Sequence, residues 1–166
     1  MIAIFEAELN HLPVVRDIAY QTWPSTYMGI VSEAQIDYML GKMYDLPVLE
    51  QQMTTQNCVF LLAKIKEEVL GFVSYQVNYQ GKLQTKIHKI YLLPQSQGQG
   101  VGKALVEAVE AAARTSNNNA LVLNVNRQNK AVQFYEKVGF VATASEDLDI
   151  GQGYFMKDFI MTKTLF

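Results

Sequence analysis

Three glycines separate an apolar stretch that ends near Leu93 from an amphipathic stretch, in the segment Gln97-Gly98-Gln99-Gly100-Val101-Gly102-Lys103. Glycine permits backbone conformations that other residues avoid, so the amide groups of such a loop can turn toward one point. A helix that begins at Val101 adds roughly half a positive charge at the same place. The sequence therefore predicts a phosphate-binding loop, with Lys103 as a further contact in the first turn of the helix.

Two common phosphate-binding motifs do not fit this loop. A P-loop needs glycine at position 97 and serine or threonine at 104, and the chain has Gln97 and Ala104. A dinucleotide fingerprint needs G-x-G-x-x-G and an acidic residue after the next strand, whereas the chain has G-x-G-x-G and Asn124-Val125-Asn126. A plain turn with a helix cap is the remaining alternative, and the three glycines directly before a helix argue against it.

The hydrophobic pattern indicates a single domain that covers residues 1–166. With 49% hydrophobic residues and 18% charged residues, the chain can form a core and does not resemble a disordered protein. Helical spacing predicts a helix that ends at Trp23-Pro24, a second that begins at Ser32 and a third after Asp45. Further expected strands are 1–7, 58–66, 69–80, 83–93, 120–126, 141–145 and 154–165, and further helices are 101–114 and 130–138. This order predicts a mixed α/β domain with an antiparallel meander in its first half.

Composition excludes several classes of protein. A net charge of −2 and a pI of about 5.7 argue against nucleic acid as a partner. The single cysteine, Cys58, and two distant histidines, His11 and His88, give no disulfide and no metal motif, so we expect no metal. The first residues lack a signal-peptide pattern and no apolar run approaches a membrane span, so a cytoplasmic protein that does not enter membranes is expected.

Two segments together resemble the GNAT superfamily of acetyl-CoA-dependent N-acetyltransferases. The pattern Gln97-x-x-Gly100-x-Gly102, between a strand and a helix, resembles the loop of that family that binds the CoA pyrophosphate. Residues 126–140 are similar to its second motif, in which Asn129 precedes a short helix that carries Tyr135 and ends at Gly139-Phe140. The resemblance implies the acyl-CoA N-acyltransferase fold, a central and mostly antiparallel mixed sheet with one splayed parallel pair, flanked by helices.

The resemblance also implies which residues bind acetyl-CoA. The end of the strand before the loop would hold the pantetheine arm, the loop would hold the pyrophosphate, and Asn129 would contact the pantetheine or cap the next helix. Tyr135 would lie beside the sulfur and donate a hydrogen bond to the leaving thiolate, although packing in the core would also explain it. The expected cofactor-binding residues are Tyr91, Leu92, Leu93, Gln97, Gly98, Gln99, Gly100, Val101, Gly102, Lys103, Asn129 and Tyr135.

The chemistry requires an amine to lose a proton before it attacks the thioester. For an alkylamine at pH 7 this step costs about 4.6 kcal/mol, so a base should matter. Many members of the family carry a glutamate on the strand before the loop, but residues 85–90 contain no carboxylate. His88 is the candidate catalytic base, with a half-exposed structural histidine as the alternative, and a local bulge would decide which face of the sheet it takes.

The resemblance implies direct transfer of an acetyl group from acetyl-CoA to a primary amine of a small molecule or a peptide. Trp23 and Tyr27 are candidate acceptor-binding residues through cation–π contact, with aromatic packing between helices as the alternative. A non-catalytic CoA-binding sensor or interaction module on the same fold stays open, since the expected carboxylate is missing. A homodimer is possible on such a fold, and the sequence does not identify the acceptor.

Overall fold

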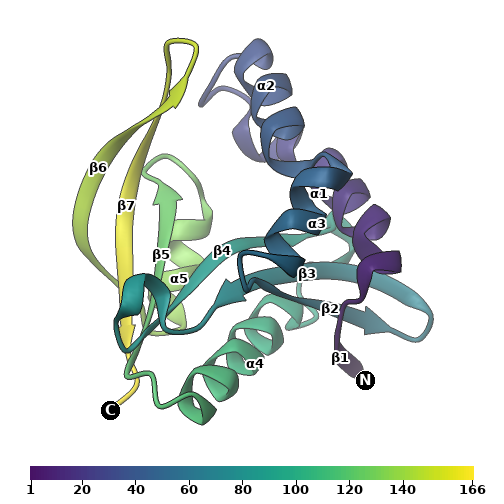
Figure 1. Cartoon of the computed structure of the whole chain (residues 1–166). Helices are drawn as coiled ribbons and strands as arrows, with labels where there is room; N and C mark the ends of the chain where they lie inside the picture. Colours follow the sequence, from purple (N-terminus) through teal and green to yellow (C-terminus); the bar gives the residue numbers. More distant parts are fainter.

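A seven-stranded sheet with the strand order β1-β2-β3-β4-β5-β7-β6 forms the centre of the computed structural model, which describes all 166 residues (Figure 1). The strands are β1 Ile2–Glu6, β2 Val59–Ile65, β3 Glu68–Gln76, β4 Gln84–Leu92, β5 Ala120–Asn126, β6 Val141–Gly151 and β7 Tyr154–Thr164. The helices are α1 Leu12–Tyr27, α2 Glu33–Tyr44, α3 Leu46–Thr54, α4 Val101–Thr115 and α5 Ala131–Lys137, with short 3-10 turns at Leu9–His11, Tyr79–Gly81 and Pro94–Ser96.

Only one pair of neighbouring strands is parallel. β4 and β5 pair from Gln84 with Ala120 to Ile87 with Leu123, and every other neighbouring pair is antiparallel. Beyond Ile87 the two strands separate (Figure 1). The expected mixed sheet with a splayed parallel pair is therefore confirmed.

Helices cover both faces of the sheet and divide the core in two. Helices α1, α2 and α3 pack on one face around Trp23, Tyr44 and Phe60, while α4 and α5 pack on the other around Leu105. Strand β3 is consequently buried on both sides, and even its polar residue Ser74 is 0% exposed. The hydrophobic pattern of residues 69–80 did not indicate this burial, because a central strand between two layers of helices has no face exposed to solvent.

Three predicted boundaries were wrong. Helix α1 continues through Pro24 to Tyr27. Proline has no N–H to donate to the carbonyl of Tyr20, four residues earlier, but Tyr20 is 37% exposed, so water can hydrogen-bond to that carbonyl instead. Strand β3 ends at Gln76, since Asn78 and Gln80 adopt left-handed backbone angles in a turn. Strand β6 continues past Ser145 to Gly151, where pairing with β7 offsets its polar composition.

The close pairing of β3 with β4 generates a testable prediction at Gly71. A Cβ atom on Gly71 would lie 2.6 Å from Leu92 Cδ2 and 3.0 Å from the carbonyl oxygen of Tyr91. Replacement Gly71→Ala should lower the free energy of unfolding by about 1–3 kcal/mol through overpacking. In the control Gly41→Ala, inside α2 with nothing within 4 Å, the free energy should rise by about 0.5–1 kcal/mol. Urea unfolding measures both, and equal stability of Gly71→Ala and the wild type would contradict the argument.

Candidate active site

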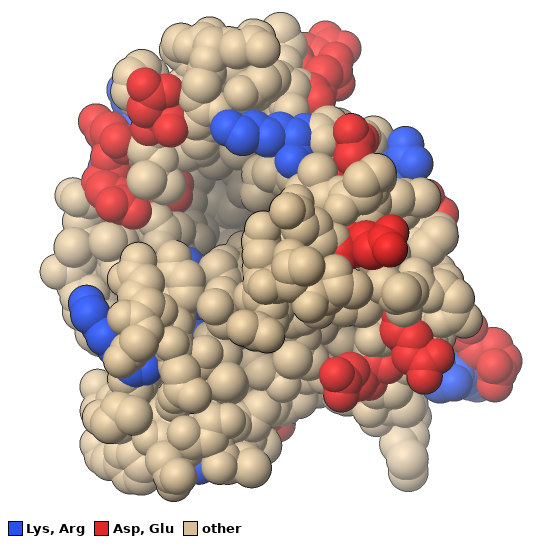
Figure 2. Space-filling view, viewed as in Figure 1, with Lys and Arg blue, Asp and Glu red and all other residues tan.

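A cavity of about 790 Å³ lies where β4 and β5 separate. Figure 2 shows the molecule hollowed between the β6–β7 hairpin and the helices α1 and α2. Most residues expected to bind acetyl-CoA line this cavity, together with the candidates for catalysis and for the acceptor. These are Trp23, Tyr27, His88, Tyr91, Leu92, Gln97, Gly98, Gly100, Val101, Gly102, Lys103, Asn129 and Tyr135.

Two of the expected cofactor-binding residues lie outside the lining. Leu93 is 6% exposed and packs into the core beside α1, with its amide donating to the carbonyl of Leu70. The Gln99 side chain is exposed, and its amide donates to the carbonyl oxygen of Gln95 at 2.7 Å. Their side chains therefore do not face the cavity, and any contact with a ligand would come from their backbone.

The glycine loop presents amide groups that no protein atom uses. Gly98 and Gly100 both have φ of +77°, which turns the chain into the first turn of α4. Gly98 and Gly100 have nothing within 4 Å of where a Cβ would lie. No backbone or side-chain acceptor takes the amide N–H groups of Gly98, Gly100, Val101, Gly102 and Lys103. Unpaired amides at a helix N-terminus fit the phosphate groups of a carrier such as CoA.

Close packing behind the loop holds it in place. A Cβ on Gly102 would lie 3.1 Å from both Leu92 Cδ1 and Phe134 Cζ, so strand β4, helix α4 and helix α5 meet at this residue. Lys103 and Lys130 line the cavity near the loop, and the Lys103 ammonium lies 3.8 Å from Glu107. The two ammonium groups place positive charge at the glycine-loop end of the cavity, where Glu107 partly balances that of Lys103.

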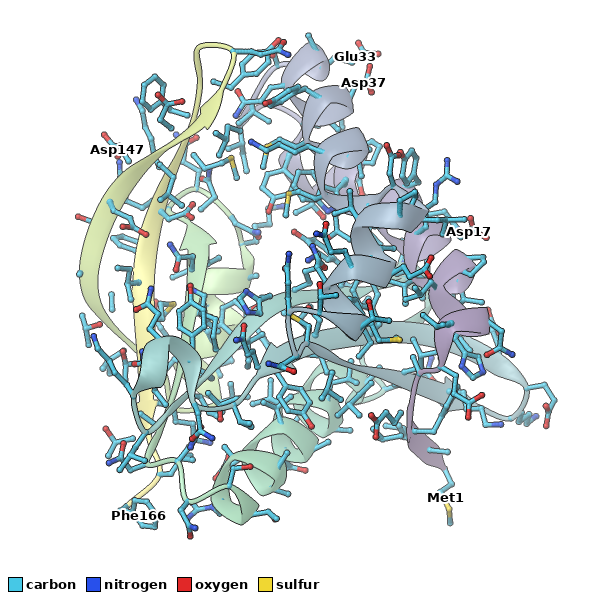
Figure 3. All side chains as sticks on the ribbon, in the orientation of Figure 1. Met1, Asp17, Glu33, Asp37, Asp147 and Phe166 are labelled. Carbon is cyan, nitrogen blue, oxygen red and sulfur yellow. The ribbon has the colours of Figure 1, made fainter.

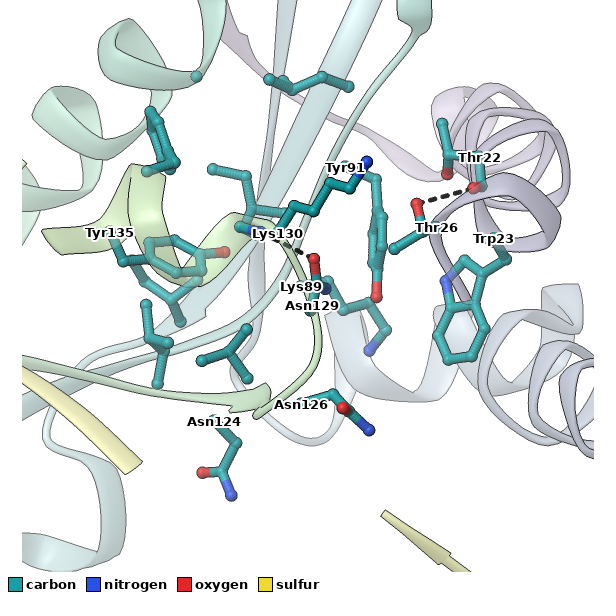
Figure 4. Close-up of a pocket in the computed structure, with 18 of the residues that line it drawn as sticks. Thr22, Trp23, Thr26, Lys89, Tyr91, Asn124, Asn126, Asn129, Lys130 and Tyr135 are labelled. Atoms are coloured by element: carbon teal, nitrogen blue, oxygen red, sulfur yellow. Dashed lines mark hydrogen bonds between the residues drawn. The ribbon is translucent and has the colours of Figure 1, made fainter. Parts of the chain in front are cut away.

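Asn129 lies two residues before α5, and Tyr135 lies in the middle of that helix. The Asn129 side-chain oxygen accepts a hydrogen bond of 2.9 Å from the Ala131 amide, which caps the helix and leaves the side-chain NH₂ for the cavity. Tyr135 is 6% exposed, and its hydroxyl points toward the cavity (Figure 4). Burial raises the pKa of Tyr135, so the phenol stays protonated and can donate a hydrogen bond.

A β-bulge decides where His88 lies. The β3–β4 register passes from Ser74 opposite Lys89 to Tyr75 opposite Ile87, so His88 is the extra residue. Ile87 and Ile90 both pack on the α4 side, while the His88 ring lies 5.4 Å from Tyr79, the ring that Lys86 also approaches. The bulge thus places His88 on the same face of the sheet as Lys86. Simple alternation along the strand would have put His88 on the face of Ile90, which lies on the opposite side.

The electrostatics of His88 reduce its value as a base. Burial and the charges of Lys89 and Lys86 lower the pKa of His88 to about 4. Its Nε2 lies 3.2 Å from the Gln76 side-chain oxygen, to which it donates as a neutral imidazole. His88 remains a candidate for accepting a proton, but it would do so weakly.

Several polar residues of the cavity were missed in the sequence analysis. They are Lys86, Lys89, Asn124, Asn126 and Asp158. The available signal was the alternation of Asn124 and Asn126 within an apolar strand, and no comparable pattern marks Asp158. Lys89 is 7% exposed, donates to Gln52 Oε1 at 2.8 Å and lies 5.6 Å from the Tyr44 ring centre. Burial lowers the pKa of Lys89 to about 8. The carboxylates Glu33, on α2, and Asp147, on the outer side of β6, lie outside the lining and are not placed to act as a base in this cavity (Figure 3).

Aromatic side chains form the wall opposite α5. The Trp23 ring lies 4.5 Å from Tyr27 and 5.8 Å from Tyr91, measured between centroids. The Tyr27 and Tyr91 hydroxyl oxygens are 3.0 Å apart (Figure 4 shows Trp23 and Tyr91). The Trp23 indole N–H is buried and has no hydrogen-bond partner. Packing within α1 and of α1 against strand β4 also accounts for these ring contacts, so a role in acceptor binding stays a prediction.

Comparison with known proteins decides the family. A family model described as an acetyltransferase (GNAT) domain matches residues 30–154. The chain belongs to this family. It is therefore an acyltransferase with acetyl-CoA as co-substrate, as the two motifs predicted. No group of three or more His, Cys, Asp or Glu side chains could hold a metal ion, and no helix is long and apolar enough to span a membrane.

Individual relatives agree along nearly the whole chain. The spermidine N(1)-acetyltransferase of Thermoplasma acidophilum is 26% identical over 167 residues, 98% of this chain and 96% of that protein. The crystal structure of the PaiA N-acetyltransferase from Thermoplasma acidophilum in complex with coenzyme A superposes with a TM-score of 0.82 at 26% identity, over 99% of each chain. A GCN5-related N-acetyltransferase from Rhodopseudomonas palustris shares the fold, with a TM-score of 0.83 at 21% identity over 98% of this chain and 95% of that one.

The low pKa of His88 predicts a pH-dependent stability. In the unfolded chain an imidazole takes up a proton near pH 6.5, whereas folded His88 does so only near pH 4. The stability of the wild type should therefore fall as the pH drops from about 6.5 to 4 more steeply than that of His88→Gln. Chemical denaturation at intervals of pH measures this difference. Parallel curves across the window would contradict it, and above pH 7 parallel curves are the expected control.

Proposed function

We propose that the chain transfers an acetyl group directly from acetyl-CoA to a primary amine of a small molecule or a peptide. The observation that carries the proposal is the set of unpaired amides at the start of α4, which adjoins a cavity between β4 and β5. In this proposal the loop holds the pyrophosphate, the separated edge of β4 holds the pantetheine, and Tyr135 donates a hydrogen bond to the departing sulfur.

One relative that matches nearly the whole chain supports an amine acceptor of low molecular weight. The Thermoplasma acidophilum protein is named for the N(1) position of spermidine, and it matches nearly the full chain at 26% identity.

The free, buried thiol of Cys58 is typical of a reducing compartment, which supports action in the cytoplasm. A homodimer is part of the same proposal, and sedimentation analysis tests it.

Substitution in the loop tests the donor site. Gly100→Asp puts a negative charge among the unpaired amides and should weaken binding of acetyl-CoA by about tenfold or more through like-charge repulsion. Gly29→Asp is the matched control, because Gly29 has φ of +80° and Gly100 has φ of +77°, and neither has an atom within 4 Å of a Cβ. Isothermal titration calorimetry measures the affinities. Equal weakening in both variants would show that backbone strain, not the loop site, is responsible.

Substitution of Tyr135 tests the leaving-group role. Tyr135→Phe keeps the ring contacts with Phe134 and Phe140 and removes only the hydroxyl. We expect kcat to fall by about tenfold or more while the affinity for acetyl-CoA stays unchanged, because the hydrogen bond forms as the thiolate departs. Steady-state kinetics with a panel of polyamines, monoamines, amino acids and peptides provides the measurement. A wild type that binds acetyl-CoA but acetylates no member of the panel would favour the sensor alternative.

A further inference from the structure

The inner face of the β6–β7 hairpin carries the one cavity-lining carboxylate. Asp158 is 6% exposed, and its Oδ1 atom is buried without a hydrogen-bond partner. The other oxygen, Oδ2, receives a single long contact of 3.4 Å from the Asn124 amide. A buried carboxylate oxygen with no donor is destabilising unless a ligand supplies one.

Neither of the two cations that act on Asp158 forms an ion pair with it. Glu146 lies opposite Asp158 in the register and accepts from Asn124 at 2.7 Å, while the Lys86 ammonium donates to the same asparagine. Lys86 thus faces two carboxylates. Arg127, the other cation that acts on Asp158, pairs with Asp147 at 2.9 Å. Asp158 therefore has no ion-pair partner within the chain, and the ammonium group of a ligand would supply one.

The other cation at this end of the cavity, Lys89, points away from Asp158. Lys89 reaches from β4 toward α3, where it donates to Gln52 and lies over the Tyr44 ring. Tyr27 lies across the cavity. Burial raises the pKa of the Tyr27 phenol, and the negative charge of Asp158 raises it further. The space in front of Asp158 is therefore bounded by the Tyr27 phenol, by Lys86, which already donates to Asn124, and by neutral amides, including Asn126 directly opposite in β5.

Apolar side chains lead from the hairpin tip to Asp158. Strand alternation puts Ile150, Leu148 and Met156 on the inner face, with Leu148 paired to Met156 and Glu146 paired to Asp158 one step further in. Helix α2 supplies Met39 and Met43 from the other side. All five line the same cavity as the glycine loop. An entering molecule would pass sulfur and hydrocarbon before it meets the carboxylate.

Hydrogen bonds fix this apolar wall across the top of the cavity. The Tyr38 hydroxyl and the Lys42 ammonium donate to the carbonyl oxygen of Ile150 at 2.8 and 2.6 Å. The Gln35 side-chain amide donates to the carbonyl oxygen of Phe155 at 2.9 Å. The hairpin is thus tied to α2 by three bonds, so the shape of the channel is set before any ligand binds.

From these contacts we propose that Asp158 binds the ammonium group of the acceptor, and that the acceptor is a primary monoamine on an apolar stem held between α2 and the β6–β7 hairpin. This inference rests on the proposed function and names its substrate class. A polyamine would have to leave a second ammonium group among Met39, Met43 and Leu148, where no carboxylate lies in the lining.

Kinetics with matched amines and an Asp158 variant test the subsite. The wild type should acetylate hexylamine or phenethylamine with a kcat/KM at least about tenfold above that for spermidine, since a desolvated charge is disfavoured. Asp158→Asn should raise the KM for hexylamine by about tenfold or more, the usual value of a hydrogen bond between charged groups, with kcat and acetyl-CoA affinity less affected. Asp37→Asn, on the exposed face of α2, is the control and should change neither.

Two further readouts separate binding from folding. Burial and the charge of Glu146 raise the pKa of Asp158, so its charge opposes folding at neutral pH and Asp158→Asn should melt at the same or a higher temperature. The kcat/KM of the wild type for hexylamine should rise with pH as Asp158 ionises, and this acid limb should be missing in Asp158→Asn.

Each outcome decides one part of the inference. A wild type that prefers spermidine would overturn the apolar stem, and an Asp158→Asn enzyme with unchanged KM and an unchanged acid limb would overturn the ammonium site. Acetylation of hexylamine in either case would leave the proposed function standing. Binding of acetyl-CoA without acetylation of any amine would overturn the proposed function and the subsite with it.

Discussion

The parallel ladder between β4 and β5 joins the two halves of this molecule and then stops. Pairing runs only from Gln84 with Ala120 to Ile87 with Leu123, while the antiparallel partners of both strands continue much further. Each strand therefore has an inner edge whose backbone groups pair with no neighbouring strand, and the cavity lies between these edges. A ladder that continued to Leu92 would close the space, so the site depends on the early end of this one pairing.

The bulge at His88 explains how one strand serves two environments. An extra residue in β4 turns His88 and Lys89 to the helical face that carries α1 to α3, and returns Ile90 and Leu92 to the face that packs on α4. Without the bulge, polar groups would alternate into the α4 core, where nothing could pair with them. The same residue that ends the regular register therefore gives the cavity its basic side chains.

Local sequence signals predicted the glycine loop for the acetyl-CoA phosphates but not the β6–β7 hairpin as the proposed acceptor site. The glycines before α4, the serine cap of α2 and the Gly139 stop of α5 act within a few residues, so the sequence alone places them. Asp158 matters because register brings it opposite Glu146 on one side and Asn126 on the other, and no periodicity within β7 contains that information. The wrong end of β6 has the same cause, since long-range pairing with β7 sustains a strand whose own composition does not favour one.

The proposed donor and acceptor sites are built from different elements, and this separation has a physical consequence. The loop at 97–103 is supported by Leu92 and Phe134 behind Gly102, so its amides can vary little without loss of packing. The proposed acceptor site lies on the β6–β7 hairpin at the edge of the sheet. Side chains of α2 hold this hairpin by hydrogen bonds to backbone carbonyl oxygens, and many residue types can donate such bonds. Changes at Leu148 or Met43 would alter the stem that fits while leaving the phosphate site untouched. Specificity for the amine can therefore shift in this fold while the thioester carrier stays the same.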